Sequence, residues 1–294
     1  MKVLVLGATG LIGRALVREL AKAGHQVQGT HHCHPGAGTL PFSLEEPLPE
    51  ALLAAVKRSD LAVFCCGLSN LGYCANNPVR AWDVNVKSTI TLIEQVLRGG
   101  TRLIFLSSDQ VFDGLRGQYT ETDPTGPLTV YGRCKVAVEQ YLLDNFRERV
   151  AVVRLAKVLA REEDGPSLLT DWFHKFNAGS TISATVDQRF CATTLDDIVM
   201  GIMRLMSGGA SGVYHLCNPQ SFSRHELLRM FAETMGFDAR LIKPCQAADL
   251  GLPDVYAYDL SMDPKKALAG NFANFTGVAE FLKTFRASTL RSDR

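Results

Sequence analysis

A tyrosine and a lysine are four positions apart in the segment Tyr131-Gly-Arg-Cys-Lys135, and Ser108 ends an apolar run earlier in the chain. Residues at i and i+4 share one face of a helix, so the phenol of Tyr131 and the ammonium of Lys135 can serve one site. A nearby cation favours the phenolate, which predicts a lowered pKa for Tyr131 and makes it a usable general acid or base. The Ser108 hydroxyl would hold a carbonyl oxygen beside it. The three side chains are predicted to move a proton while a hydride moves elsewhere.

Tyrosine and lysine also fall at this spacing by chance on amphipathic helices, so the N-terminal segment decides the interpretation. A short apolar run at 2–6 leads into Gly7-Ala8-Thr9-Gly10-Leu11-Ile12-Gly13, and helical spacing follows to Ala23. Strand, glycine turn and helix form the context that a dinucleotide motif requires. Gly7 would permit the tight turn, Gly10 the approach of a pyrophosphate, and Gly13 close packing of helix on strand. The helix N-terminus would favour the anion.

The end of the second predicted strand, 26–30, indicates which dinucleotide binds. An acidic residue there binds the 2′-hydroxyl of NAD and repels a 2′-phosphate. This strand ends in Thr30-His31-His32-Cys33-His34, and no acidic residue comes before Glu45. The sequence therefore favours NADP over NAD. The same tract could be read as a metal site, but its neighbouring residues would point to opposite faces and no second ligand cluster exists, so no metal is predicted.

Composition excludes several classes of function. The chain has 294 residues, 46% hydrophobic and 21% charged, with a formal net charge of +1. It lacks the basic footprint of a nucleic-acid or membrane-surface protein. No apolar run reaches the ~18 residues of a membrane span. The chain enters a strand directly, which predicts no signal peptide. Its eight cysteines include no C-x-x-C and are predicted to be reduced thiols of a cytoplasmic protein.

Alternating strands and helices predict an α/β fold with a doubly wound parallel sheet, of the Rossmann type. Residues 1–155 are predicted to form the dinucleotide-binding domain, and 156–294 mainly a smaller substrate-binding region with segments returning to the sheet. The predicted strands are 2–8, 26–30, 60–67, 102–108 and 150–155, and the predicted helices are 11–23, 48–58, 78–98 and 129–147. The second region has predicted helices near 166–177, 195–206, 223–235 and 277–286, extended segments at 181–185 and 212–217, and an irregular tail from Ala248.

Ligands of such sheets bind beyond the carboxyl ends of the strands. Gly7, Gly67, Ser108 and Tyr131 all fall at or just after predicted strand ends. The glycine turn and the proposed proton-transfer residues are therefore expected at one edge of one sheet.

These motifs resemble the extended short-chain dehydrogenase/reductases, and within them the dTDP-4-dehydrorhamnose reductase family. The stretch from Ser107 to Gly114, SSDQVFDG, is similar to the family's central signature, and Asn85 matches its helix asparagine. Further similar positions are Tyr119 to Pro124, Pro127, Tyr131-Gly132, Lys135, Glu139, Asp187-Gln188, Asp196-Asp197 and Gly212 to Leu216.

The resemblance implies reduction of the 4-keto group of a nucleotide-linked deoxysugar by NADPH or NADH. Tyr131 would give the proton, Lys135 would shift its pKa and contact the ribose, and Ser108 would hydrogen-bond the carbonyl. The expected cofactor-binding residues are Gly7, Thr9, Gly10, Leu11, Ile12, Gly13, Thr30, His31, Cys66, Gly67, Asn85, Tyr131 and Lys135. Substrate contacts are expected from Ser69, Ser108, Lys157 and Arg189. An arginine fork suits a diphosphate, although Arg189 could equally pair with Asp187 at the surface, and Lys157 could equally be a solvated lysine.

Several substrate-side positions depart from the family pattern. Gln110 stands where the family has a tyrosine, and Lys157 where it has a tryptophan near the sugar. Gly72, Ala75, Ala192 and Leu252 also differ from the usual residues. The proton-transfer residues are retained while the substrate contacts change, so the sequence leaves the identity of the sugar open.

Two other functions are compatible with the same residues. An epimerase or dehydratase would keep NAD bound and recycle it, although the missing ribose-reading acid argues against this. A regulatory partner resembling the methionine adenosyltransferase beta subunit would use the fold without turnover, although the retained Ser108, Tyr131 and Lys135 argue for chemistry. The expected partner is a small nucleotide sugar, with no nucleic acid or membrane, and a homodimer is left open.

Overall fold

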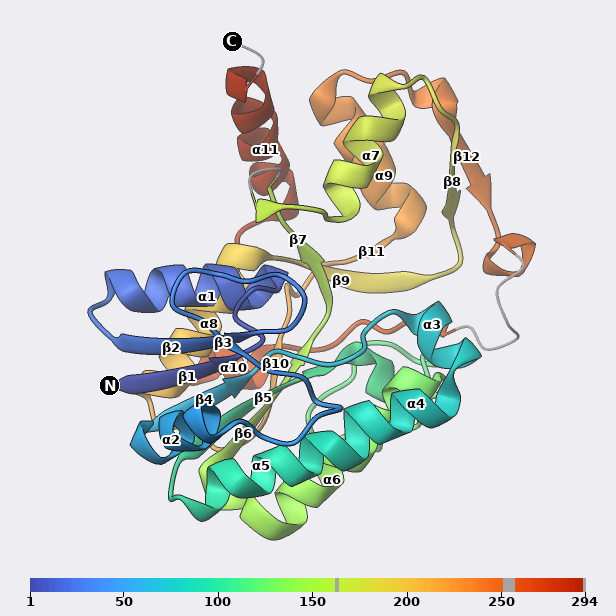
Figure 1. Cartoon of the computed structure of the whole chain (residues 1–294). Coiled ribbons are helices and arrows are strands. Elements are labelled where there is room, and N and C mark those ends of the chain that lie inside the picture. Colours follow the sequence, from blue (N-terminus) through green and yellow to red (C-terminus); the bar gives the residue numbers. More distant parts are fainter. Residues whose placement is uncertain (162–163, 251–256, 293–294) are drawn as a thin grey trace.

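A parallel seven-stranded sheet forms the larger part of the molecule (Figure 1). The computed structural model describes residues 1–161, 164–250 and 257–292. Across the sheet the strands are β10 (Gly212–Leu216), β6 (Val150–Leu155), β5 (Arg102–Ser108), β4 (Leu61–Phe64), β1 (Lys2–Leu6), β2 (Gln26–His31) and β3 (Leu40–Pro41). The predicted Rossmann-type fold is confirmed. Within the described residues, no helix has the length and apolar character needed to cross a membrane.

The central strands are buried on both faces, as a parallel sheet covered by crossover helices requires. In β1, Val3 and Val5 point into one core with α1 (Leu11–Lys22) and α8 (Leu195–Ser207). Leu4 and Leu6 point into a second core on the opposite face. That second core is covered by α2 (Glu50–Arg58), α5 (Thr89–Arg98) and α6 (Val130–Phe146).

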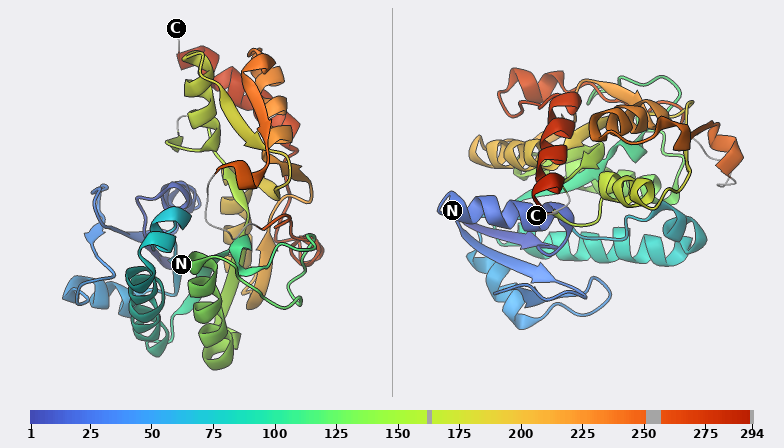
Figure 2. Two further views of the ribbon diagram at one scale, coloured as in Figure 1. Left: turned by 90° about the vertical axis from the view of Figure 1, so that its right-hand side faces the viewer. Right: turned by 90° about the horizontal axis from the view of Figure 1, so that it is seen from above.

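A smaller lobe projects from one side of the sheet domain (Figures 1 and 2). Its own core packs side chains such as Trp172 and Phe231 from three helices. These helices are α7 (Leu168–Asn177), α9 (Arg224–Met235) and α11 (Val278–Ser292). Its strands are β8 (Ile182–Thr185) paired with β12 (Ile242–Cys245), and β7 (Lys157–Leu159), β9 (Arg189–Thr194) and β11 (Ser221–Ser223) in a three-stranded sheet.

The second half of the chain contributes to both parts of the molecule. Strand β10 pairs with β6 at the edge of the large sheet, and α8 packs on α1. Short elements escape the sequence patterns: β3, β7, β11 and β12 span four residues or fewer, too few for periodicity to identify. The tail expected to be irregular contains α10 (Lys265–Ala269).

Candidate active site

A cavity of about 760 Å³ lies where the carboxyl ends of the large sheet face the smaller lobe. Residues far apart in the sequence meet here, because parallel strands deliver their following loops to one edge. The predicted site residues in its lining are Gly10, Leu11, Ile12, Gly13, Cys66, Gly67, Ser69, Ser108, Tyr131, Lys135, Lys157 and Arg189. Gly7, Thr9, Thr30, His31 and Asn85 were also predicted site residues, and they are not among the residues that line this cavity.

The glycines at the start of α1 have different roles. Gly7 has a φ of +85°, a backbone angle that residues other than glycine rarely adopt. A Cβ on Gly13 would lie 2.1 Å from the Gly7 carbonyl oxygen, so the helix could not approach the loop with any side chain there. A Cβ on Gly10 would have only that oxygen nearby, at 3.5 Å. The folded chain tolerates a side chain at Gly10, and the open space beside this helix N-terminus fits an approaching pyrophosphate.

Thr30 holds the glycine loop through a hydrogen bond. Its side chain is 1% exposed, and its hydroxyl accepts a hydrogen bond from the Gly7 N–H at 3.0 Å. The next residue, His31, is hydrogen-bonded through Nδ1 to the Thr39 hydroxyl at 2.7 Å. This hydroxyl is buried and turned towards the loop, so Thr30 stabilises the glycine loop, and its expected role in cofactor binding stays a prediction.

Asn85 fixes the loop that follows β4. Its Oδ1 accepts from the Leu68 N–H at 2.8 Å, and its Nδ2 donates to the Leu68 carbonyl at 2.9 Å. A Cβ on Gly67 would lie 2.8 Å from the Asn85 Oδ1, so the glycine allows this approach. Asn85 belongs to a π-helical turn, η1 (Asp83–Ser88), of a kind often found at functional sites. Its two hydrogen bonds to Leu68 hold the loop that carries Gly67, which lines the cavity.

The first turn of α6 carries Tyr131 to the end of β5. Thr129 caps the helix by accepting from the Gly132 N–H. A Cβ on Gly132 would lie 2.0 Å from the Gln110 carbonyl oxygen, so the helix begins in direct contact with the loop after β5. The Lys135 ammonium donates to the Leu106 carbonyl at 2.8 Å and lies 5.5 Å from the centre of the Tyr131 ring. The predicted meeting of Ser108, Tyr131 and Lys135 at one cavity is what the structure contains.

The electrostatics of Tyr131 differ from the prediction. Burial raises the pKa of Tyr131, and the neighbouring Asp109 carboxylate raises this pKa further. Burial also lowers the pKa of Lys135 to about 8. The prediction that Lys135 brings the Tyr131 pKa towards neutrality is therefore wrong, because desolvation disfavours the phenolate and the neighbouring Asp109 adds to this effect. Tyr131 stays protonated at neutral pH, as a proton donor must.

Asp109 is the most perturbed carboxyl group of the site, and the sequence patterns gave it no role of its own. Burial raises its pKa to about 6. The Ser108 hydroxyl donates to Asp109 Oδ1 at 2.8 Å and accepts from the Gln110 N–H at 3.2 Å. Its position in the sequence could have indicated a role in the site, because Asp109 directly follows the last residue of a buried strand.

The smaller lobe supplies cations to the other side of the cavity. Lys157 is exposed to the cavity, and Arg224 lies half-buried at the start of α9 with its guanidinium over the Trp172 ring. Neither forms an ion pair with any residue that the structure describes. Arg189 also lines the cavity, but its guanidinium pairs with Glu226 at 3.1 Å. Sequence reasoning missed Arg224, since no motif marks it.

The residues that depart from the family pattern are spread over the site. Gln110 lines the cavity beside Ser108. Gly72 and Ala75 lie on the short helix α3 (Leu71–Asn76), and Ala192 is buried in β9. Leu252 lies outside the described residues.

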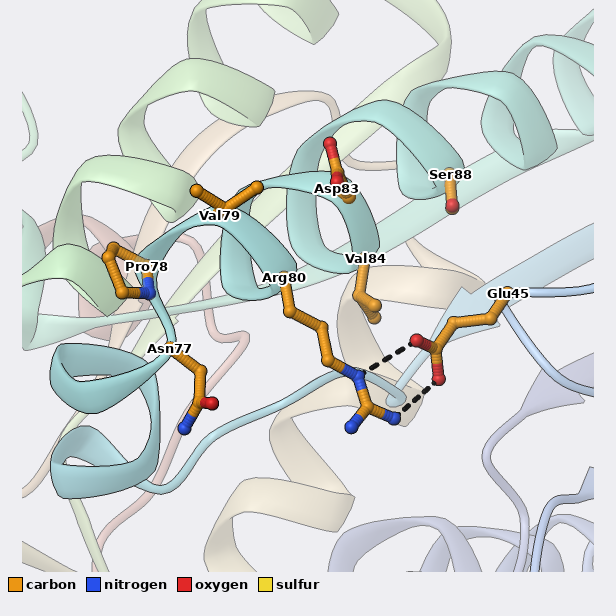
Figure 3. A pocket seen from close by; sticks show the side chains of 8 residues that line it. All are labelled: Glu45, Asn77, Pro78, Val79, Arg80, Asp83, Val84 and Ser88. Atoms are coloured by element: carbon orange, nitrogen blue, oxygen red, sulfur yellow. Dashed lines mark hydrogen bonds and ion pairs between the residues drawn. The ribbon is translucent and has the colours of Figure 1, made fainter.

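A second, more open hollow runs along α4 (Pro78–Trp82) and η1 (Figure 3). Arg80 reaches across it to the Glu45 carboxylate, with both contacts at 2.9 Å, and ties the loop after β3 to α4. Arg80 also donates to the Tyr73 hydroxyl at 2.8 Å. This hollow contains none of the predicted catalytic residues, so the chemistry is assigned to the larger cavity.

Known proteins resemble this chain in sequence and in fold. A family model described as the RmlD substrate binding domain matches residues 1–270. The dTDP-4-dehydrorhamnose reductase of Mycolicibacterium smegmatis is 27% identical over 247 residues, covering 83% of this chain and 72% of the relative. Methionine adenosyltransferase 2 subunit beta of Xenopus tropicalis is 26% identical over 259 residues, covering 85% and 77%. A solved dTDP-4-dehydrorhamnose reductase from Bacillus anthracis, in complex with NADP, shares the fold with a TM-score of 0.83, 19% identity, and coverage of 98% and 99%.

Replacing Gly10 with valine tests the glycine loop directly. The added side chain fits the folded chain, because the nearest atom to a Cβ there is 3.5 Å away, but it fills the space beside the helix N-terminus. We expect an unchanged melting temperature and dinucleotide affinity weakened roughly 10- to 100-fold, from the about 1–3 kcal/mol of steric overpacking. Titration followed by calorimetry measures this. Gly277→Val, where an added Cβ meets nothing within 4 Å, is the control. Full affinity in a folded Gly10→Val protein would contradict the assignment.

Proposed function

The chain belongs to the RmlD substrate binding domain family, and from this premise we propose that it is an NADPH-dependent reductase of the 4-keto group of a nucleotide-linked deoxysugar. The observation that carries the proposal is the shared cavity, which brings the glycine loop, Ser108 and the Tyr131 phenol together. Its named relatives include dTDP-4-dehydrorhamnose reductases, so dTDP-4-dehydrorhamnose is the first substrate to test.

The residues around the cavity divide the work of a ketone reduction. A bound dinucleotide supplies the hydride. Tyr131, protonated because burial raises its pKa, gives a proton to the oxygen of the former ketone. Ser108 binds that oxygen through its hydroxyl. The glycine loop would hold the cofactor pyrophosphate at the start of α1, and Lys135 would contact the ribose.

Loss of the Tyr131 hydroxyl is expected to remove the proton donor and little else. Tyr131→Phe deletes one oxygen, for which the described residues provide no hydrogen-bond partner, so folding and cofactor affinity should persist. The turnover number should fall by roughly 10²- to 10⁴-fold, the usual contribution of general acid–base catalysis. Cofactor oxidation in the presence of dTDP-4-dehydrorhamnose measures it. Wild-type turnover by Tyr131→Phe would show that another group gives the proton.

NADPH is proposed as the cofactor because the end of β2 has no acidic residue to repel a 2′-phosphate. The related Bacillus anthracis structure was solved with NADP. Titration of both reduced cofactors should show tighter binding of NADPH. The difference should shrink with added salt, since the 2′-phosphate is charged. Equal or tighter binding of NADH would refute this part of the proposal.

The smaller lobe is proposed to hold the diphosphate of the substrate. Lys157 and Arg224 bring two cations without ion-pair partners among the described residues to one wall of the cavity. The Thr185 hydroxyl on the same wall is buried and has no hydrogen-bond partner in the described parts of the chain. Two cations and a free hydroxyl are groups that bind phosphate oxygens.

Arg224→Ala tests this part of the site. A hydrogen bond to a charged group contributes about 1.5–3 kcal/mol, so KM for the sugar nucleotide should rise roughly 10- to 100-fold. The KM for NADPH should stay the same. Arg229→Ala is the control, because Arg229 lies on the same helix and pairs with Glu233 at the surface. A KM for the sugar nucleotide that is equal in both variants would exclude Arg224 from the binding site.

A regulatory subunit is the second candidate function, favoured by the similarity to methionine adenosyltransferase 2 subunit beta. Such a protein would bind a dinucleotide without turning over a sugar. Absence of NADPH oxidation with every 4-keto sugar nucleotide tested, in a protein that binds NADPH, would move this candidate ahead.

We also propose that the protein is cytoplasmic. All eight cysteines are free thiols, and four of them are buried. Thiols persist in the reducing environment of the cytoplasm and tend to form disulfides outside it.

A further inference from the structure

The hydrogen bonds of the Ser108 hydroxyl limit what it can offer to a ligand. A serine hydroxyl has one proton and two lone pairs. The Gln110 N–H occupies one lone pair, at 3.2 Å, and the proton is donated to Asp109 Oδ1, at 2.8 Å. Only a lone pair then remains for the cavity. A ketone oxygen has no proton to donate to it, so in this arrangement Ser108 cannot hold a ketone.

Protonation of Asp109 reverses the arrangement. A neutral carboxylic acid carries an O–H that can donate to the Ser108 oxygen. Ser108 then accepts two hydrogen bonds, from Gln110 and Asp109, and its own proton is free to bind a ketone oxygen. With Asp109 ionised, the free lone pair of Ser108 instead suits the hydroxyl of an alcohol, which has a proton to give.

We propose that the charge of Asp109 decides which ligand Ser108 can hold: the neutral acid prepares Ser108 for the ketone substrate, and the carboxylate prepares it for the alcohol product. Asp109 acts through Ser108 and is a positioning residue. The inference rests on the proposed ketone reduction and adds to it a residue that sets its pH dependence.

The surroundings of Asp109 place this change of charge within the working range of an enzyme. The residue is 8% exposed, and burial raises the pKa of its carboxyl group to about 6. Three titratable groups face it from other elements: Lys157 on β7, Tyr131 on α6 and Cys217 after β10. Burial raises the pKa of both Tyr131 and Cys217, so these two are neutral near pH 6. Lys157 is the cation that opposes burial and lowers the Asp109 pKa.

A pH profile therefore separates Asp109 from Tyr131. For ketone reduction, kcat/KM of the wild-type enzyme should be constant at low pH and fall tenfold per pH unit above about pH 6, as Asp109 loses its proton. The decline in kcat should come at higher pH, because bound ligands exclude water and disfavour the carboxylate further. Oxidation of the alcohol product should show the opposite trend and rise with pH through the same range.

Asp109→Asn is the decisive variant. Asparagine can donate to Ser108 through its amide group and cannot ionise. Its reduction rate should persist through neutral pH and decline only in the alkaline range, where first Lys135 and then Tyr131 lose their protons. Asp144→Asn, exposed on α6, should keep the wild-type profile. Ser108→Ala should be slower and should also lose the decline near pH 6, because Asp109 would have no hydroxyl to act through.

Lys157 provides an independent shift in the same experiment. Lys157→Met removes the cation that favours the carboxylate, so the decline should move to higher pH. Lys157→Arg keeps the charge and should restore the wild-type position.

A decline near pH 6 that survives in Asp109→Asn or Ser108→Ala would overturn the inference and leave the reductase proposal standing. Loss of reduction at every pH in a folded Asp109→Asn protein would also overturn it, since a permanently neutral side chain should support the ketone. Absence of turnover by the wild-type protein would contradict the proposed function, and this inference with it.

Discussion

The site depends on two helices that begin in contact with the loops before them. At the start of α1, a side chain on Gly13 would lie 2.1 Å from the Gly7 carbonyl oxygen. At the start of α6, a side chain on Gly132 would lie 2.0 Å from the Gln110 carbonyl oxygen. Glycine at both positions lets each helix N-terminus close onto the carboxyl edge of the sheet. The first contact shapes the glycine loop, and the second brings Tyr131 into the cavity that Ser108 also lines.

Burial at this edge then determines the chemistry. Burial removes water from around an acidic side chain and so favours its neutral form. Tyr131 is kept protonated, and the Asp109 carboxyl group titrates at a higher pH than usual. The Lys135 ammonium donates a hydrogen bond to the Leu106 carbonyl. Desolvation is thus the dominant influence on the site, and single charges modify it.

The sequence predicted those features that local patterns encode. The alternation of strand and helix patterns predicted the parallel sheet, and the glycine turn predicted the edge of the sheet at which the site lies. Both features depend only on residues that are neighbours in the sequence. The hydrogen bond from the Gly7 N–H to the Thr30 hydroxyl could not be predicted from the motif, since it depends on how β2 lies beside the loop. The Tyr131 pKa was misjudged because burial is a property of the assembled fold. Arg224 was missed because only the smaller lobe's packing brings it to the cavity.

Transfer of deuterium from labelled cofactor to the sugar tests directly whether the protein is a ketone reductase. The protein would be incubated with NADPH carrying deuterium at C4 of the nicotinamide and with dTDP-4-dehydrorhamnose, with each face of the ring labelled in turn. For a ketone reductase we expect oxidation of the cofactor in step with product formation, and deuterium at C4 of the sugar alcohol for one of the two labels. Conversion of the sugar without net cofactor oxidation and without deuterium at C4 would contradict it and indicate a retained, recycled dinucleotide.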